Sequence, residues 1–184
     1  MMIYSTPRPA TLYDKQKIIS LYREVALRSG GIVREAHEVT EEYVDKFLRN
    51  SLADGIILVV EDAESDRIVG EIHTYKHGIN VFSHVFGHLT IVVHPSFQRK
   101  GIVRTLFTAL LHEVRSNYPE VLRVELIAKE SNSVAIGFYR SLGFVEEGRM
   151  EMRIRRQDGG FEADIPMAWI SSCKENFDER TSPV

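Results

Sequence analysis

Apolar positions along the chain switch several times between the spacing of an amphipathic helix and the short runs typical of buried strands. Helical spacing predicts a helix from about Thr11 to Gly30-Gly31, a second that begins near Thr40, a long third after Gly101 and a short fourth over 133–142. Apolar runs and alternation predict strands at 3–8, 56–60, 67–75, 89–93, 121–128, 144–155 and 161–170. The sequence Asp158-Gly159-Gly160 predicts a hairpin turn between the last two strands.

The order of these elements predicts the class of fold. The series β-α-α-β-β-β-α-β-α-β-β favours a single mixed α/β domain over residues 1–170, in which helices cover a mainly antiparallel sheet, followed by a polar tail at 171–184. The helix after Gly101 is a crossover connection, so we expect the strands on either side of it to be parallel neighbours. Residues 76–86 are open to two interpretations, a long loop or the frayed end of a strand.

Composition narrows the classes of protein that remain. The chain has 184 residues, of which 43% are hydrophobic, and 23 Lys and Arg against 26 Asp and Glu give a formal net charge of −3. This balance excludes binding of nucleic acid through overall positive charge. The single cysteine, Cys173, excludes an internal disulfide and a cysteine-rich zinc site. No apolar run approaches the roughly 20 residues that span a bilayer, and the start lacks the pattern of a signal peptide, so we expect a cytoplasmic protein.

The stretch from Leu89 to Leu111 carries the most chemical information. An apolar strand ends at Pro95, and Gly101 precedes a strongly amphipathic helix. A glycine between a strand and a helix lets main-chain N–H groups converge, and a helix N-terminus favours negative charge, so the segment predicts an anion site. Arg99, Lys100 and Arg104 crowd this positive end, where cations oppose the helix dipole unless an anion binds. The alternative is a solvated basic turn that only caps the helix.

Two blocks of residues resemble the GCN5-related N-acetyltransferase (GNAT) superfamily. The family signature Gln/Arg-x-x-Gly-x-Gly/Ala is matched by Gln98-Arg99-Lys100-Gly101-Ile102-Val103. A second block over 131–144 is similar to the family's Asn…Ala…Phe-Tyr…Leu-Gly-Phe segment. The resemblance covers roughly residues 3–170. Val103 departs from the signature, and its branched side chain either crowds the cofactor's pyrophosphate or points into the core.

The resemblance implies a fold and a cofactor. The fold would be a mixed, mainly antiparallel central sheet flanked by helices, with acetyl-CoA in a cleft between the splayed parallel strands 89–93 and 121–128. The implied cofactor contacts fall into three groups. They are the strand backbone at Ile91, Val92 and Val93, the signature turn at Gln98, Arg99, Lys100, Gly101, Ile102, Val103 and Arg104, and the side chain of Asn132, which also suits a helix N-cap.

The resemblance also implies that Tyr139 is the general acid that protonates the leaving thiolate. It follows Asn132 by seven residues, about two helical turns, which places both on one face. Its alternative is an aromatic side chain packed beside Phe138.

The general base has no motif behind it. Removing a proton from an alkylamine costs about 4.6 kcal/mol at pH 7, so some group must accept it. Glu71 and His88 are the candidates, and each also suits an ordinary surface or strand-edge position. Glu125 suits an ion pair with Arg123 instead. The histidines are scattered without ligand spacing, and we expect no metal site.

These observations predict an acetyl-CoA-dependent N-acetyltransferase that transfers an acetyl group to a primary amine of a small molecule or peptide. Cys173 lies outside both motif blocks, so direct attack by the amine in a ternary complex is favoured over an acyl-enzyme. The alternative is a catalytically inactive CoA-binding module of the same fold. We expect no nucleic-acid or membrane partner, and a homodimer is left open. The charges of mixed sign around the expected acceptor pocket do not identify the amine.

Overall fold

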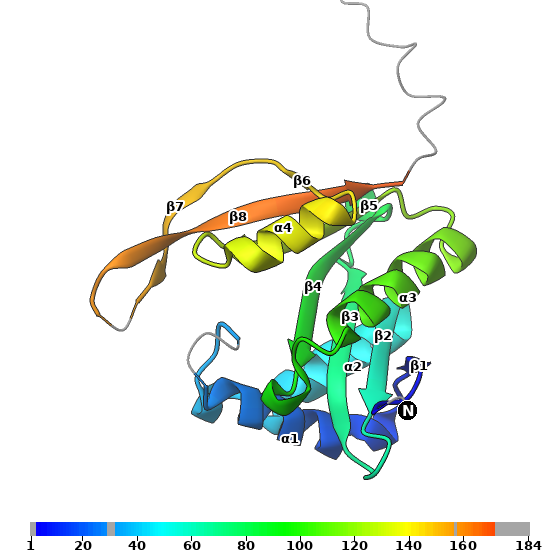
Figure 1. Cartoon of the computed structure of the whole chain (residues 1–184). Helices are drawn as coiled ribbons and strands as arrows, with labels where there is room; N and C mark the ends of the chain where they lie inside the picture. The colour runs from blue at the N-terminus through cyan, green and yellow to red at the C-terminus, as the bar shows by residue number, and fades with distance from the viewer. Residues whose placement is uncertain (1–2, 29–31, 157, 172–184) are drawn as a thin grey trace, which may run out of the picture. The chain divides into compact units, whose positions relative to one another are not determined.

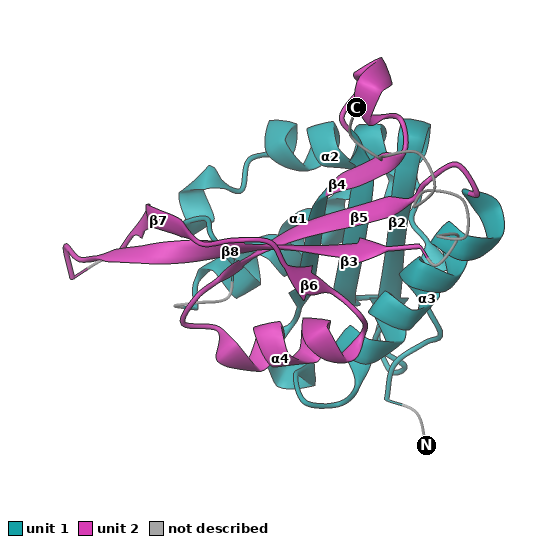
Figure 2. Cartoon of the chain, turned by 90° about the horizontal axis from the view of Figure 1, so that it is seen from above, with its two compact units in different colours: residues 1–76, 88–118 teal, residues 77–87, 119–184 magenta. Residues whose placement is uncertain are grey.

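A computed structural model describes residues 3–28, 32–156 and 158–171 of the chain (Figure 1). Gly30-Gly31, at which the first helix is predicted to break, and Cys173 both lie outside these ranges. The chain divides into two compact units, Met1–Lys76 with His88–Tyr118 and His77–Gly87 with Pro119–Val184 (Figure 2). Within the described ranges, no helix combines the length and the apolar character needed to cross a bilayer.

The first unit contains a sheet with helices on both faces. Its elements are β1 (Arg8–Pro9), η1 (Leu12–Asp14), α1 (Lys15–Ala26), η2 (Ala36–Glu38), α2 (Glu41–Asp54), β2 (Gly55–Glu61), β3 (Ile68–Lys76), the His88–Val93 part of β4 (Val85–Val93), η4 (Pro95–Phe97) and α3 (Ile102–Asn117). The strand order is β1-β2-β3-β4, and the pairs β1-β2 and β2-β3 are antiparallel. Helix α2 begins next to Thr40 as predicted, and the Thr40 hydroxyl caps it by accepting the N–H of Tyr43.

Strand β2 is apolar at every inner position because both of its faces are covered. Ile57 and Val59 belong to a buried cluster with α1 and α2. On the other face, Val60 and Ile102 press against the position of Gly70, where an added Cβ would come within 2.7 Å of each of them. Successive strand residues point to opposite faces, so a strand between two helical layers reads as a continuous apolar run rather than an alternating one.

The predicted first strand at 3–8 is shorter than expected. Only Arg8–Pro9 form β1, and Tyr4 makes an isolated antiparallel bridge to Asp62. The interruption between Tyr4 and Arg8 contains Pro7, which has no N–H to donate to a continuous ladder.

The second unit holds the Val85–Gly87 part of β4, β5 (Arg123–Lys129), α4 (Ser133–Ser141), β6 (Val145–Glu146), β7 (Met150–Arg155) and β8 (Phe161–Ile170), with the 3-10 turn η3 (Asn80–Phe82) before β4. The order is β4-β5-β8-β6, and β7 also pairs with β8. Strands β4 and β5 are parallel at Val85↔Arg123 and Phe86↔Val124, whereas β5, β6 and β7 all run antiparallel to β8. The predicted mixed α/β class, the mainly antiparallel sheet and the parallel pair are therefore confirmed.

Two predicted strand bounds are wrong. β4 begins at Val85 rather than Leu89 because buried Val85 and Phe86 already pair with β5, so the segment 76–86 contains both a loop and a strand start. The predicted strand 144–155 is broken into β6 and β7. The break lies opposite Pro166 of β8, whose carbonyl accepts the N–H of Glu147 but which has no N–H to return the bond.

An ion pair between half-exposed Arg8 and buried Asp14 fastens β1 to the turn before α1. Arg8 donates to both carboxylate oxygens of Asp14, at 2.8 and 2.9 Å, and also to Glu61 of β2 at 2.7 Å. Asp14 is only 4% exposed, and it also accepts the main-chain N–H of Thr11 at 2.8 Å. The Arg8 guanidinium is the main reason that the pKa of Asp14 falls from 3.8 to about 2.

Replacing Asp14 by Asn is expected to lower the free energy of unfolding at pH 7 by about 2 kcal/mol. Because the pKa is depressed in the folded state, the stabilisation is complete above pH 4 and is lost as the pH falls toward 2. Urea denaturation of the wild type and Asp14→Asn should therefore give stabilities that converge across this interval. Asp66→Asn, at an exposed carboxylate, is the control and should show little effect. A constant difference down to pH 2 would contradict the prediction.

Candidate functional site

His94 fixes the start of the connection between β4 and α3. Its main-chain N–H donates to the carbonyl of Val69 at 2.8 Å, and its Nδ1 accepts the N–H of Ser96 at 3.2 Å. Since Nδ1 accepts, Nε2 carries the hydrogen and donates to Glu24 of α1 at 2.8 Å. Strand β3 and helix α1 thus both hold the turn at its first residue.

The backbone then enters the left-handed region of φ at two residues before α3 begins. Arg99 has φ +60° and Gly101 has φ +90°, whereas Lys100 between them is not left-handed. Such alternation makes consecutive N–H groups converge into an anion-binding concavity. Gly101 is the N-cap of α3 and the first helical backbone bond runs from the N–H of Thr105 to its carbonyl at 3.0 Å. The N–H groups of the turn before Thr105 consequently have no carbonyl partner within the helix.

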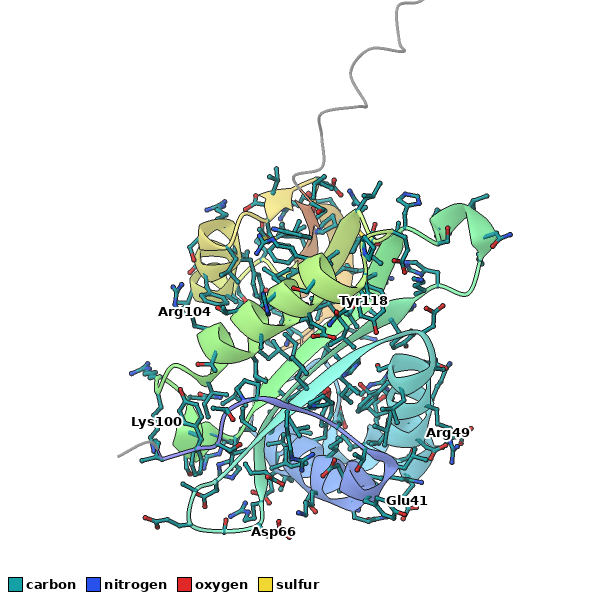
Figure 3. All side chains as sticks on the ribbon, turned by 90° about the vertical axis from the view of Figure 1, so that its right-hand side faces the viewer. Glu41, Arg49, Asp66, Lys100, Arg104 and Tyr118 are labelled. Atoms are coloured by element: carbon teal, nitrogen blue, oxygen red, sulfur yellow. The ribbon has the colours of Figure 1, made fainter. Side chains whose placement is uncertain are left out.

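The side chains of this turn separate into an outer basic set and an inner apolar anchor. Arg99, Lys100 and Arg104 are exposed, and Figure 3 shows Lys100 and Arg104 near the start of α3. Ile102 is buried against Gly70, whereas Val103 is half-buried. The arrangement places main-chain donors, the positive end of a helix dipole and basic side chains together, which suits a phosphate-bearing ligand.

Strand β4 leaves part of its length accessible just before this turn. His88 is exposed, residues 89–91 are half-buried, and Val92 and Val93 are buried. His88 also has φ +56°, which is uncommon for a residue with a side chain. A left-handed residue inside a strand disrupts the ladder there and redirects its side chain, a feature frequent beside functional sites.

A row of flat rings leads from the core of the first unit to His88. The ring of His88 stacks on Tyr75 with centroids 4.4 Å apart and an interplanar angle of 11°. Tyr75 is followed by His73 at 6.2 Å, and His73 stacks on Phe47 at 4.1 Å. The period of two along β3 places Tyr75, His73 and Glu71 on one face.

Glu71 lies at the buried end of this row and is 0% exposed. Its carboxylate accepts the hydroxyl of Tyr22 at 2.6 Å and lies 3.0 Å from Nδ1 of His73. Burial, together with the nearby charge of Glu71, raises the pKa of Tyr22 well above its usual value, so this hydroxyl stays protonated. Glu71 is therefore a core carboxylate that is contacted by two side chains and shielded from solvent.

The second unit carries the other predicted site residues on α4. The Asn132 side chain accepts the N–H of Ala135 at 3.2 Å, which confirms its interpretation as an N-cap. Tyr139 is half-buried, with its ring 5.8 Å from that of Phe138 and 6.1 Å from that of Phe144. Burial raises the pKa of Tyr139 above 10, so its hydroxyl is protonated at neutral pH.

Glu125 of β5 is bound to its own strand. Arg123 donates to Glu125 at 2.6 Å, which confirms the predicted ion pair between them. Arg123 also donates to Glu147 at 2.8 Å. The same guanidinium lowers the pKa of Glu147.

Sequence reasoning missed two residues that contact candidate site groups. His73 could have been found, because Glu71, His73 and Tyr75 alternate along one strand and therefore share a face. Tyr4 had no such signal, yet its hydroxyl donates to the carbonyl of Lys100 at 3.3 Å, across 96 positions of sequence.

Comparison with known proteins identifies a family and a fold. A family model described as an acetyltransferase (GNAT) domain matches residues 53–146, just over half of the chain. No curated protein matches in sequence. A GNAT acetyltransferase from Streptococcus pneumoniae is 19% identical with a TM-score of 0.81, over 91% of this chain and 99% of that one.

Two further solved structures show the same fold. A ribosomal-protein-alanine N-acetyltransferase from Brucella melitensis is 24% identical with a TM-score of 0.77, over 90% of this chain and 99% of that one. A phosphinothricin acetyltransferase from Sinorhizobium meliloti, in complex with acetyl-CoA, is 19% identical with a TM-score of 0.78, over 92% and 89%.

Replacing Tyr22 by Phe is expected to lower the free energy of unfolding by about 1–3 kcal/mol, because the buried Glu71 carboxylate loses one of its two donors. Urea denaturation checks this value. Tyr13→Phe is the matched control, since Tyr13 is 95% exposed and its hydroxyl should contribute little. Equal stabilities for Tyr22→Phe and the wild type would show that the bond is dispensable.

Proposed function

Because the chain belongs to the GNAT family of acetyltransferases, we propose that it is an acetyl-CoA-dependent N-acetyltransferase that acts on a primary amine of a small molecule or peptide. The observation that carries the proposal is the turn from Gln98 to Arg104, with its left-handed Arg99 and Gly101 and its exposed basic side chains. The two acceptor types are those in the names of the Brucella melitensis and Sinorhizobium meliloti enzymes.

The residues of the turn fit a diphosphate. An added Cβ at Gly101 would meet only the Tyr4 hydroxyl, at 3.4 Å, so the main chain is open to close approach elsewhere. We assign the diphosphate to the main-chain N–H groups of Arg99 through Arg104, with the exposed side chains as counter-charges. The backbone of Ile91–Val93 would pair with the pantetheine amides. Gln98 would orient the turn, as its amide donates to the Val93 carbonyl at 3.4 Å.

Asn132, at the start of α4, is proposed to bind the cofactor through its side-chain amide. Its Oδ1 accepts the Ala135 N–H at 3.2 Å, which leaves the amide NH₂ as the donor toward the cofactor. Val103 is half-buried, so its side chain is partly directed to the protein interior.

Acetyl-CoA, when bound, supplies an acetyl thioester. In the proposed reaction the amine nitrogen forms a bond to the acetyl carbon and the carbon–sulfur bond breaks, without an acyl-enzyme. Tyr139 returns a proton to the thiolate, since a tyrosine hydroxyl carries its proton at neutral pH.

His88 is the proposed acceptor of the amine proton. It is exposed, and an imidazole is chemically suited to proton transfer near neutral pH. Glu71 is proposed to act indirectly, because it is buried and bonded to His73, which lies in the same row of rings as Tyr75 and His88. Its role would be to hold that row in place.

Release of free thiol from acetyl-CoA in the presence of a panel of primary amines tests the proposal, with calorimetry of CoA binding in parallel. Binding together with amine-dependent thiol release is expected. Binding without release on any amine would favour the inactive module, and absence of binding would overturn the assignment of the turn.

Replacing Tyr139 by Phe is expected to lower kcat by about 10²–10⁴-fold, because the thiolate then leaves without a proton. The dissociation constant for CoA should stay within about twofold of the wild-type value, since the ring is retained. Tyr13→Phe should leave both quantities unchanged. Full turnover in Tyr139→Phe would remove Tyr139 from the mechanism.

Replacing His88 by Ala is expected to lower kcat/KM for the amine by about 10²-fold at pH 7. The deficit should shrink as the pH approaches 10, because an alkylamine of pKa about 10.4 then loses its proton to water. His112→Ala, at an exposed histidine of α3, is the control. A deficit that is independent of pH would contradict a role as proton acceptor.

A further inference from the structure

Tyr4 lies against the signature turn although it precedes it by almost a hundred residues. Its segment is tied to the edge of β2, where Ser5 N–H donates to the Glu61 carbonyl at 2.8 Å and Ser5 Oγ accepts the Glu61 N–H at 2.9 Å. The half-buried Tyr4 hydroxyl lies 3.3 Å from the carbonyl oxygen of Lys100 and 3.4 Å from Oγ1 of Thr105. Tyr4 is thus held from one side and contacts the turn on the other.

The contact to Lys100 sets the direction of one peptide group. A carbonyl only accepts, so the Tyr4 hydroxyl is the donor. In a trans peptide the C=O and N–H bonds point in opposite directions, so a Lys100 carbonyl held toward Tyr4 turns the Gly101 N–H away from it. This peptide precedes a glycine, which adopts either sign of φ with little cost, and would otherwise rotate readily.

The next carbonyl is occupied as well. The Gly101 oxygen accepts the N–H of Thr105 at 3.0 Å and lies 3.2 Å from the Thr105 hydroxyl. The carbonyls of Lys100 and Gly101 are therefore both engaged by protein donors. A rotated Lys100–Gly101 peptide would instead present a carbonyl oxygen where the turn now offers an N–H, and that oxygen would repel a phosphate.

We propose that Tyr4 is a positioning residue for coenzyme A binding, whose hydroxyl holds the Lys100–Gly101 peptide so that the Gly101 N–H faces the diphosphate. The inference rests on the proposed function of the turn. Tyr4 lies outside both motif blocks and acts through the main chain of the turn rather than by touching the ligand.

Tyr4→Phe removes the hydroxyl and keeps the ring. Calorimetry should show CoA bound about fivefold to tenfold more weakly than by the wild type, the effect of one lost hydrogen bond. The same ratio of dissociation constants between variant and wild type should be found with dephospho-CoA, which retains the diphosphate. The difference between variant and wild type should disappear in kcat/KM for S-acetylpantetheine, which lacks the diphosphate. The melting temperature and kcat at saturating acetyl-CoA should match those of the wild type and of Tyr13→Phe.

Unchanged CoA affinity in Tyr4→Phe would overturn the inference and leave the proposed function intact. An equal loss with S-acetylpantetheine would also overturn it, since the hydroxyl would then support the fold in general. Failure of the wild type to bind CoA would instead reject the proposed function itself, so the two failures are distinguishable.

Discussion

Main-chain donors at the start of α3 are the constraint on which the account depends. The chain leaves β4 and enters α3 through two left-handed residues, Arg99 and Gly101, and the N–H groups before Thr105 have no helical carbonyl to bind. Such donors need a partner, and a diphosphate supplies several acceptor oxygens together with the charge that the helix dipole and the basic side chains favour. The basic residues that weaken the apo turn become counter-charges once an anion is present.

Three contacts within the first unit hold that turn in place. His94 joins the turn to β3 and α1, Ile102 anchors α3 against Gly70, and Tyr4 engages the Lys100 carbonyl. On the face of β3 opposite to Gly70, the buried Glu71 carboxylate contacts Tyr22 and His73. A rigid polar core beside an exposed, left-handed His88 is the pattern of a site whose geometry is fixed before ligand binds.

Much of this could be predicted from sequence because it is local. The Gln98–Val103 signature and the 131–144 block are contiguous in the chain, so the family, the fold class and the position of the turn follow from them. The capping roles of Thr40 and Asn132 are equally local. Long-range features were out of reach: the break opposite Pro166 depends on strand register, and the Tyr4 contact depends on how a distant segment docks. The buried state of Glu71 also depends on α1, since its charge alone suggests an exposed residue.

The most direct test follows the amide resonances of the turn by ¹H–¹⁵N correlation spectroscopy while CoA is added to the full chain. The account predicts saturable shifts at Gly101, Ile102 and Val103, larger than those elsewhere on α3, that are much reduced when pantetheine replaces CoA. Saturable binding that leaves these three amides unmoved would contradict the claim that the main chain of this turn holds the diphosphate.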